Sequence, residues 1–157
     1  MLKSPLSLAL ILGITCALVP VGVKANPLEA VVGSIVDGDT VTLNQGGSSI
    51  AAQLACIDTP DWINGQPQPN AQGSKDYLTN LIPVGSSVQY YNVGSTGAGA
   101  RTLVVIFSQR QNINLQMVAA GQATLHPNYA RTCANSANDL ANAENNARNQ
   151  GLGIWGR

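Results

Sequence analysis

A chain of 157 residues is long enough for one domain with its own hydrophobic core. It contains eight basic and eight acidic residues, and charged residues make up only 10% of it. The formal net charge is zero and becomes −2 if Lys3 and Lys24 are removed with an N-terminal segment. A net charge of −2 argues against strong non-specific binding of nucleic acid, because such binding needs basic residues that neutralise phosphates.

The first 25 residues have the pattern of a signal peptide. Lys3 provides a positive N-terminal region, an apolar run extends over residues 6–23, and Val23-Lys24-Ala25 forms a small-x-small cleavage site. We expect cleavage after Ala25, a secreted or periplasmic protein, and no membrane association afterwards. The alternative is a retained anchor, but Pro20 near the end of the apolar run favours a removable signal.

Removal of Lys3 and Lys24 with this segment would leave six basic residues against eight acidic ones, a net charge of −2. Residues 26–30 then form a linker, and residues 31–157 form one domain that we expect to be a monomer. Cys56 and Cys133 are the two cysteines of this part of the chain. In an oxidising compartment they can form one disulfide, or they can be two separate buried thiols.

Hydrophobic alternation and turn residues predict five β-strands and three helices. The strands are expected at residues 30–36, 40–43, 49–58, 86–93 and 101–109, with Gly46-Gly47 as a hairpin turn between the second and the third. The helices are expected at residues 71–82, 112–120 and 135–150, each followed by Pro or Gly. Residues 61–70, 94–100 and 122–129 are expected to be loops or irregular.

Three meander strands, a helix and two more strands follow the order of a five-stranded oligonucleotide/oligosaccharide-binding barrel. We therefore predict an α+β, β-rich fold, namely a five-stranded OB-fold-like barrel with three helices.

Residues 37–61 contain four of the eight acidic residues and no Lys or Arg. The stretch opens with Asp37-Gly38-Asp39 and closes with Asp58-Thr59-Pro60-Asp61, with the predicted hairpin between them. A hairpin brings its far ends together, so Asp39 and Asp58 can meet in space. Clustered carboxylates repel each other unless a cation lies between them, and hard oxygen ligands favour Ca²⁺ or Mg²⁺. The alternative is two unrelated acidic turns, because both motifs are ordinary turn chemistry.

Six short motifs follow one another between about residues 31 and 155. They are Asp37-Gly38-Asp39-Thr40, Ile57-Asp58-Thr59-Pro60, Arg101 at the start of the fifth strand, Asn114-x-x-Met117-Val118-x-x-Gly121-x-Ala123, Ala143-Glu144-x-x-Ala147-Arg148 and Gly153-Ile154-Trp155. In this order and spacing the chain resembles the thermonuclease (staphylococcal nuclease-like) family.

The resemblance implies Ca²⁺-assisted hydrolysis of phosphodiester bonds in DNA or RNA. By position, Asp39 and Asp58 match the family's carboxylate ligands of the ion, and Thr59 matches the residue whose backbone carbonyl faces it. Arg101 matches one of two catalytic arginines, whose guanidinium can hold a phosphate with two hydrogen bonds and stabilise the transition state. Tyr129 matches a residue that stacks on a base.

Departures from the family pattern put catalysis in doubt. Gln53 occupies the position of the second catalytic arginine, and an arginine in this role is worth roughly 10³–10⁵ in rate. Asp61 replaces a Glu that positions or deprotonates the attacking water, and a displacement of about 1 Å can cost on the order of 10² in rate; Asp61 can instead cap its loop. Ala98-Gly99-Ala100 lacks the Lys and Tyr that often precede the arginine. His126 is expected to be a surface residue.

Three functions are compatible with these residues, in this order of preference. The first is a secreted Ca²⁺-dependent nuclease whose activity on nucleic acid is attenuated by Gln53 and Asp61. The second is a catalytically inactive nuclease-fold module that binds nucleic acid, glycan or protein. The third is a structural domain in which the acidic cluster binds Ca²⁺ only for stability. In each case Glu144 and Trp155 are expected to be structural, with Glu144 accepting hydrogen bonds from loop amides.

Overall fold

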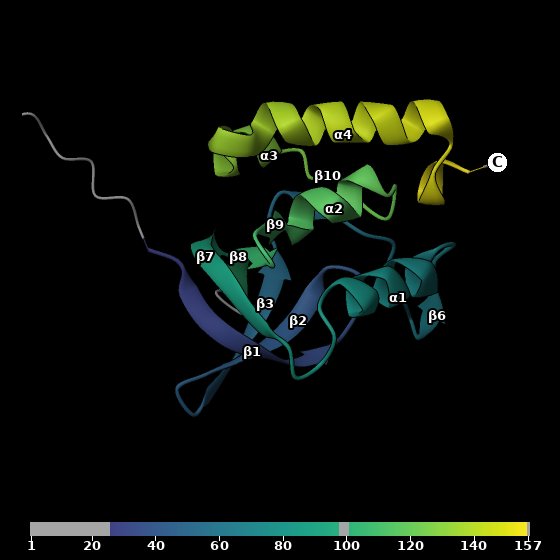
Figure 1. Ribbon diagram of the computed structural model, residues 1–157. Helices are drawn as coiled ribbons and strands as arrows, with labels where there is room; N and C mark the ends of the chain where they lie inside the picture. Colours follow the sequence, from purple (N-terminus) through teal and green to yellow (C-terminus); the bar gives the residue numbers. More distant parts are fainter. Residues whose placement is uncertain (1–25, 98–100, 157) are drawn as a thin grey trace, which may run out of the picture.

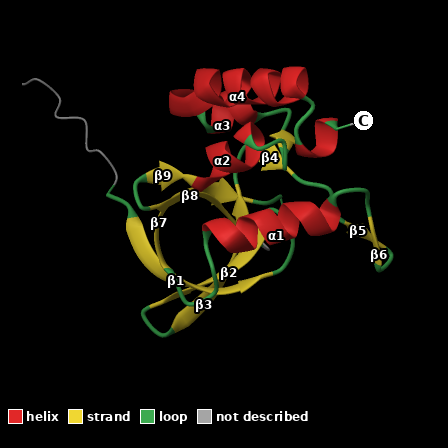
Figure 2. Cartoon of the chain, turned by 45° about the vertical axis from the view of Figure 1, so that its right-hand side comes forward, coloured by secondary structure: helices red, strands yellow, loops and turns green. Residues whose placement is uncertain are grey.

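The protein forms a closed five-stranded barrel with helices packed against it (Figures 1 and 2). The computed structural model describes residues 26–97 and 101–156. The barrel strands are β1 (Leu28–Ile35), β2 (Thr40–Gln45), β3 (Ser48–Leu54), β7 (Ser87–Ser95) and β8 (Thr102–Ser108). Neighbours in the order β3-β2-β1-β7-β8 pair antiparallel, and a parallel pairing of β3 with β8 closes the barrel. The predicted α+β fold with an OB-fold-like barrel is therefore confirmed.

The hairpin of β2 and β3 turns at the two glycines, as expected. Gly46 and Gly47 have φ angles of 56° and 85°, a left-handed pair that glycine adopts without the steric cost of a Cβ. The register places Thr40 opposite Gln53. The end of β3 therefore returns to the beginning of β2, beside the acidic turn that precedes β2.

Three helices have seven or more residues: α1 (Ala71–Leu81), α2 (Ile113–Ala119) and α4 (Ala137–Gln150). Each lies within two residues of its expected limits. The single turn α3 (Tyr129–Thr132) and two 3-10 turns (Ala134–Ser136 and Gly153–Trp155) complete the helical part of the described chain. The side chain of Asn112 begins α2 by accepting a hydrogen bond from the Leu115 N–H at 3.1 Å. In Figure 1, α2 lies between the barrel and α4.

The prediction of a single third strand over residues 49–58 is wrong. β3 ends at Leu54, and the two-residue strand β4 (Ile57–Asp58) follows a turn. Cys56 in this turn has a φ of 72°, which interrupts the extended backbone, and it forms a disulfide with Cys133 across a Cα–Cα distance of 6.3 Å. β4 pairs with β10 (Thr124–Leu125), inside the segment expected to be irregular. These pairings join residues far apart in the chain, which local patterns do not reveal.

Residues 61–70, expected to be a loop, contain a small hairpin. Its strands are β5 (Trp62–Ile63) and β6 (Gln66–Pro67). Asn64 and Gly65 form the turn with φ angles of 51° and 77°, and Asn-Gly is a strong signal for such a turn. The proline-rich composition hid this signal. A further short strand, β9 (Gln111–Asn112), extends the sheet beyond β8.

Buried side chains from all five barrel strands and from α1, α2 and α4 form one core cluster. The largest fully buried side chains are Leu43, Leu54, Ile57, Leu78, Ile82, Ile106, Ile113, Met117 and Leu140. The core therefore continues from the barrel through α2 to α4, and it holds both parts in one unit.

Asn114 is buried at the junction of α2 with the barrel. Its Oδ1 accepts a hydrogen bond from the Ile106 N–H at 3.0 Å, and its Nδ2 donates to the carbonyls of Ala55 at 2.9 Å and Val104 at 3.0 Å. One side chain thus ties α2 to β8 and to the turn after β3.

No helix within residues 26–97 and 101–156 is long and apolar enough to cross a membrane. The expected signal peptide at residues 1–25 lies outside the described residues, and so does Ala98-Gly99-Ala100.

Candidate active site

The turn between β1 and β2 holds Asp37 and Asp39, each only 8% exposed. Oδ1 of Asp37 accepts hydrogen bonds from the backbone N–H groups of Asp39 at 3.0 Å and Thr40 at 2.7 Å. In this way Asp37 closes its own turn. The turn therefore uses Asp37 for structure and leaves Asp39 as the carboxylate available for chemistry.

The carboxylate of Asp39 is held by two side chains. Its Oδ1 accepts a hydrogen bond from Thr40 Oγ1 at 2.9 Å, and its Oδ2 accepts one from Gln53 Nε2 at 3.3 Å. Burial, followed by the negative charge of Asp37, raises the pKa of Asp39 to about 7. A nearby cation would favour the ionised form and lower this pKa again.

Gly38 shows that the two acidic motifs meet. A Cβ on Gly38 would lie 2.9 Å from both Cβ and Oγ1 of Thr59, and 2.7 Å from Cβ of Ser74 on α1. Any side chain at this position would overlap both residues. Glycine therefore lets the Asp37–Asp39 turn pack directly against Thr59, at the far end of the predicted hairpin.

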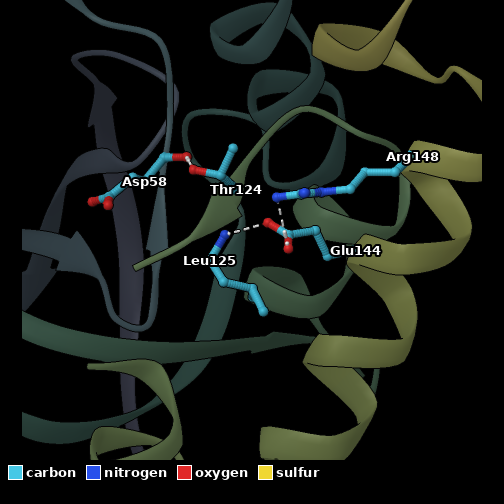
Figure 3. Close-up of polar contacts among 5 residues, drawn as sticks. All are labelled: Asp58, Thr124, Leu125, Glu144 and Arg148. Atoms are coloured by element: carbon cyan, nitrogen blue, oxygen red, sulfur yellow. Dashed lines mark hydrogen bonds and ion pairs between the residues drawn. The ribbon is translucent and has the colours of Figure 1, made fainter. Parts of the chain in front are cut away.

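A series of polar contacts links α4 to the backbone of Asp58 (Figure 3). Arg148 pairs with Glu144 at 3.2 Å, and Oε1 of Glu144 accepts a hydrogen bond from the Leu125 N–H at 2.9 Å. Leu125 belongs to β10. The other residue of this strand, Thr124, donates a hydrogen bond from Oγ1 to the backbone carbonyl of Asp58 at 3.3 Å. The Asp58 carboxylate points away from Thr124 in Figure 3. Glu144 thus has the structural role that the sequence predicts.

Asp61 is exposed and lies at the base of the β5–β6 hairpin. Its Oδ1 accepts a hydrogen bond from the Trp62 N–H at 2.6 Å, and its own N–H donates to Gln68 Oε1 at 2.7 Å. The Asp61 carbonyl accepts a further bond from the Gln68 N–H at 2.8 Å. These contacts agree with the loop-capping alternative. Oδ2 of Asp61 has no hydrogen bond within the described part of the chain.

Arg101 is exposed and directly precedes β8. Its N–H donates to Thr96 Oγ1 at 3.2 Å, and its carbonyl accepts a bond from the Thr96 N–H at 3.0 Å. The parallel pairing that closes the barrel places Gln53 opposite Leu103, two residues after Arg101. The two positions expected to hold catalytic arginines therefore lie near each other, although they are far apart in the sequence.

A cavity of about 500 Å³ adjoins this part of the barrel. Gln53 and Asp58 line it together with the end of β7 and the segment around α3. This segment contributes His126, which is half-buried rather than on the surface as expected, and Arg131, which sequence reasoning missed. No local signal points to either residue, because the β4–β10 pairing and the disulfide bring them here.

Tyr129 is not among the residues that line this cavity. Its side chain is partly buried against the hydrophobic core, and its N–H donates to the carbonyl of His126 at 2.9 Å. Its expected stacking on a base stays a prediction.

The donors at the acidic turn suit a hard cation. The carboxylates of Asp39 and Asp58 and the backbone carbonyl of Thr59 are oxygen ligands of the kind that Ca²⁺ takes. The raised pKa of Asp39 points in the same direction, since a bound cation would offset the cost of a buried negative charge. No group of three or more His, Cys, Asp or Glu side chains gathers for a metal within residues 26–97 and 101–156.

The barrel and its acidic turn define a domain of the nuclease-like barrel class. The family described as "Staphylococcal nuclease homologue" matches residues 51–157, and the chain belongs to this family. An "Uncharacterized endonuclease" of Haemophilus influenzae is 36% identical over 122 residues, which cover 77% of this chain and 62% of that protein. The chain thus spans less than two thirds of that relative's length. Family and relative together support a nuclease-like function.

Proposed function

We propose that the protein is an exported nuclease that hydrolyses phosphodiester bonds of DNA or RNA with the aid of Ca²⁺, at a rate reduced by Gln53 and Asp61. The observation that carries the proposal is the packing of the Asp39 turn against Thr59, beside the barrel closure that bears Arg101. Membership of the family and the relative named as an endonuclease agree with it.

Each residue has a separate task in this proposal. Asp39, Asp58 and the carbonyl of Thr59 would hold Ca²⁺, which supplies Lewis-acid activation of a phosphate oxygen when bound. The guanidinium of Arg101 would hold the phosphate through two N–H···O bonds and stabilise the negative charge of the transition state. Asp61 would orient the attacking water through Oδ2 and accept its proton. The water oxygen bonds to phosphorus, the bond to the leaving oxygen breaks, and that oxygen takes up a proton from the surrounding water.

The reduced rate follows from two side chains. Gln53 donates a hydrogen bond from Nε2 to Oδ2 of Asp39 and offers no positive charge to a phosphate. The loss of an arginine here is expected to cost roughly 10³–10⁵ in rate. Asp61 is one methylene shorter than Glu, and one of its oxygens is engaged by the Trp62 N–H. The same two internal contacts favour the second candidate function, a catalytically inactive module that binds nucleic acid, glycan or protein.

A cleavage assay separates the two functions. Purified protein is incubated with single-stranded DNA and with RNA, in Ca²⁺ or in chelator, and we expect slow cleavage that requires Ca²⁺. Arg101→Gln is expected to abolish it, whereas Arg110→Gln removes the same charge from an exposed residue outside the site and is expected to leave it unchanged. No cleavage at high protein concentration would end the nuclease proposal.

The attenuation has its own test. Gln53→Arg combined with Asp61→Glu is expected to raise the rate by at least about 10³. If the unaltered protein is inactive and the double variant cleaves, the protein is a binding module on an intact scaffold. A fast unaltered protein would show that Gln53 and Asp61 do not limit catalysis.

We also propose that residues 1–25 are removed on export. The disulfide between Cys56 and Cys133 supports an oxidising compartment. N-terminal sequencing of the exported protein is expected to begin at Asn26, and exported material that begins at Met1 would contradict this.

A further inference from the structure

Arg131, which is far from Gln53 in the sequence, supplies a positive charge to the cavity that Gln53 lines. No Lys or Arg occurs between Val31 and Lys75, yet Arg131 lines the same cavity as Gln53 and Asp58. Asp58 is the one acidic residue among the residues that line this cavity. An arginine in a polar cavity is suited to an anionic ligand, because its planar fork matches the oxygens of a phosphate.

The guanidinium of Arg131 is not engaged by a carboxylate of the described chain. Within residues 26–97 and 101–156 the one ion pair within 4 Å joins Arg148 to Glu144. The backbone N–H of Arg131 donates to the Asn128 carbonyl at 3.1 Å, which fixes the backbone. The Arg131 side chain is exposed and is therefore available to a ligand.

The segment that bears Arg131 is fastened to the acidic side of the cavity. Cys133, two residues after Arg131, is bonded to Cys56, which lies two residues before Asp58. The His126 N–H donates to the Cys56 carbonyl at 3.0 Å. These two links fix the backbone on both sides of Arg131, so less of the segment has to be ordered when a ligand binds the exposed Arg131 side chain.

His126 adds a second donor to the cavity. Its Nδ1 accepts a hydrogen bond from the Asn128 N–H at 3.2 Å. The ring hydrogen is therefore on Nε2, which remains as a donor. Arg131 and His126 together provide N–H donors from one segment that the disulfide and the His126–Cys56 hydrogen bond fasten to the barrel.

We propose that Arg131, together with His126 of the same cavity, binds a phosphate of a single-stranded nucleic acid next to the phosphate that is cleaved. The identity of the ligand rests on the proposed function. The volume of about 500 Å³ lies within the range of about 300–1,000 Å³ found for ligand pockets. Arg131 thereby supplies a strand contact that neither Gln53 nor the segment before Arg101 offers.

Binding of a fluorescein-labelled oligothymidine strand of about 12 nucleotides, a length within the range of single-strand sites, tests the proposal. Fluorescence anisotropy is measured in chelator, so that no cleavage occurs, over a series of salt concentrations. The variants are Arg131→Gln, Arg131→Lys and Arg110→Gln. The two glutamine variants change the net charge equally, and Arg110 does not line this cavity.

We expect Arg131→Gln to weaken binding about tenfold or more, as for loss of a charged hydrogen bond. It is also expected to reduce the slope of log K against log salt by about 0.7, the value for one phosphate contact on a single strand. Arg131→Lys should keep the slope, and Arg110→Gln should behave like the unaltered protein. Equal effects of Arg131→Gln and Arg110→Gln, or no binding by the unaltered protein at low salt, would overturn the proposal. Loss of binding in Arg131→Gln without any nuclease activity in the parent would refute the proposed function and leave the phosphate site standing.

Discussion

Replacement of Asp39 by Asn tests the electrostatics of the acidic turn. Burial and the charge of Asp37 raise the pKa of Asp39 from its ordinary value of 3.8 to about 7. The folded state therefore holds a proton on Asp39 between about pH 4 and pH 7, where the unfolded chain has lost it. The free energy of unfolding falls as the pH rises through this window, because the folded state must then accept a buried negative charge.

The size of the effect follows from the shift. Each pKa unit corresponds to 1.36 kcal/mol, so a shift of about three units gives up to about 4 kcal/mol above pH 7 and nothing below pH 4. Asp39→Asn keeps a carbonyl acceptor for Thr40 and carries no charge. We expect the variant to equal the parent in stability near pH 4 and to exceed it by up to about 4 kcal/mol at pH 8 in chelator.

Urea unfolding followed by tryptophan fluorescence measures these free energies at several pH values. Ca²⁺ should stabilise the parent at pH 8, because a ligand that binds only the folded state raises its stability, and it should not stabilise Asp39→Asn. Asp76→Asn, which removes an exposed carboxylate on α1, serves as the control and should follow the parent. Parallel pH profiles for the parent and Asp39→Asn would refute the argument from burial.

Three further substitutions test the framework of the site by urea unfolding. Cys133→Ser opens a link between residues 77 positions apart and is expected to lower the free energy of unfolding by about 4 kcal/mol; an unchanged value would mean that the link does not restrict the unfolded chain. Asn114→Ala removes three buried hydrogen bonds and should cost about 3 kcal/mol or more, against less than about 0.5 kcal/mol for the exposed Asn138→Ala. Glu144→Ala leaves the Leu125 N–H without its acceptor and should cost about 1–3 kcal/mol, whereas Glu144→Gln keeps an acceptor and should cost less; equal losses would contradict the role of that bond.

Much of the barrel was predictable because its signals are local. The alternation of apolar residues marks the strands, Gly46-Gly47 marks the hairpin, and the three longer helices lie within two residues of their expected limits. Two of the errors in the secondary-structure prediction have different causes. Asn64-Gly65 is a local turn signal that the surrounding prolines hid. The break at Cys56 lies at a residue with positive φ that is bonded to the distant Cys133, and the neighbouring residues give no signal for it.

The residues of the candidate site also fall into two groups, those that the sequence indicates and those that only the structure places. The acidic motifs, Arg101 and the departures at Gln53 and Asp61 are visible in the sequence, because each depends on residue type and spacing along a short stretch. The hairpin between the two acidic motifs indicated that Asp39 and Asp58 can meet; the structure packs Gly38 of the first motif against Thr59 of the second, and a shared ion site stays a prediction. Sequence reasoning did not find Arg131 or the place of His126, because both reach the cavity through contacts between distant segments.

The sequence by itself thus determined the strand and helix pattern, the family resemblance and the carboxylates of the acidic turn. The tertiary structure decided which other side chains accompany them. Closure of the barrel by β3 and β8 brings Gln53 close to Arg101, and the Cys56–Cys133 disulfide brings Arg131 to the cavity beside Asp58. The physical reason is that long-range pairings depend on the packing of the whole core, whereas turns and strands depend on a few neighbouring residues.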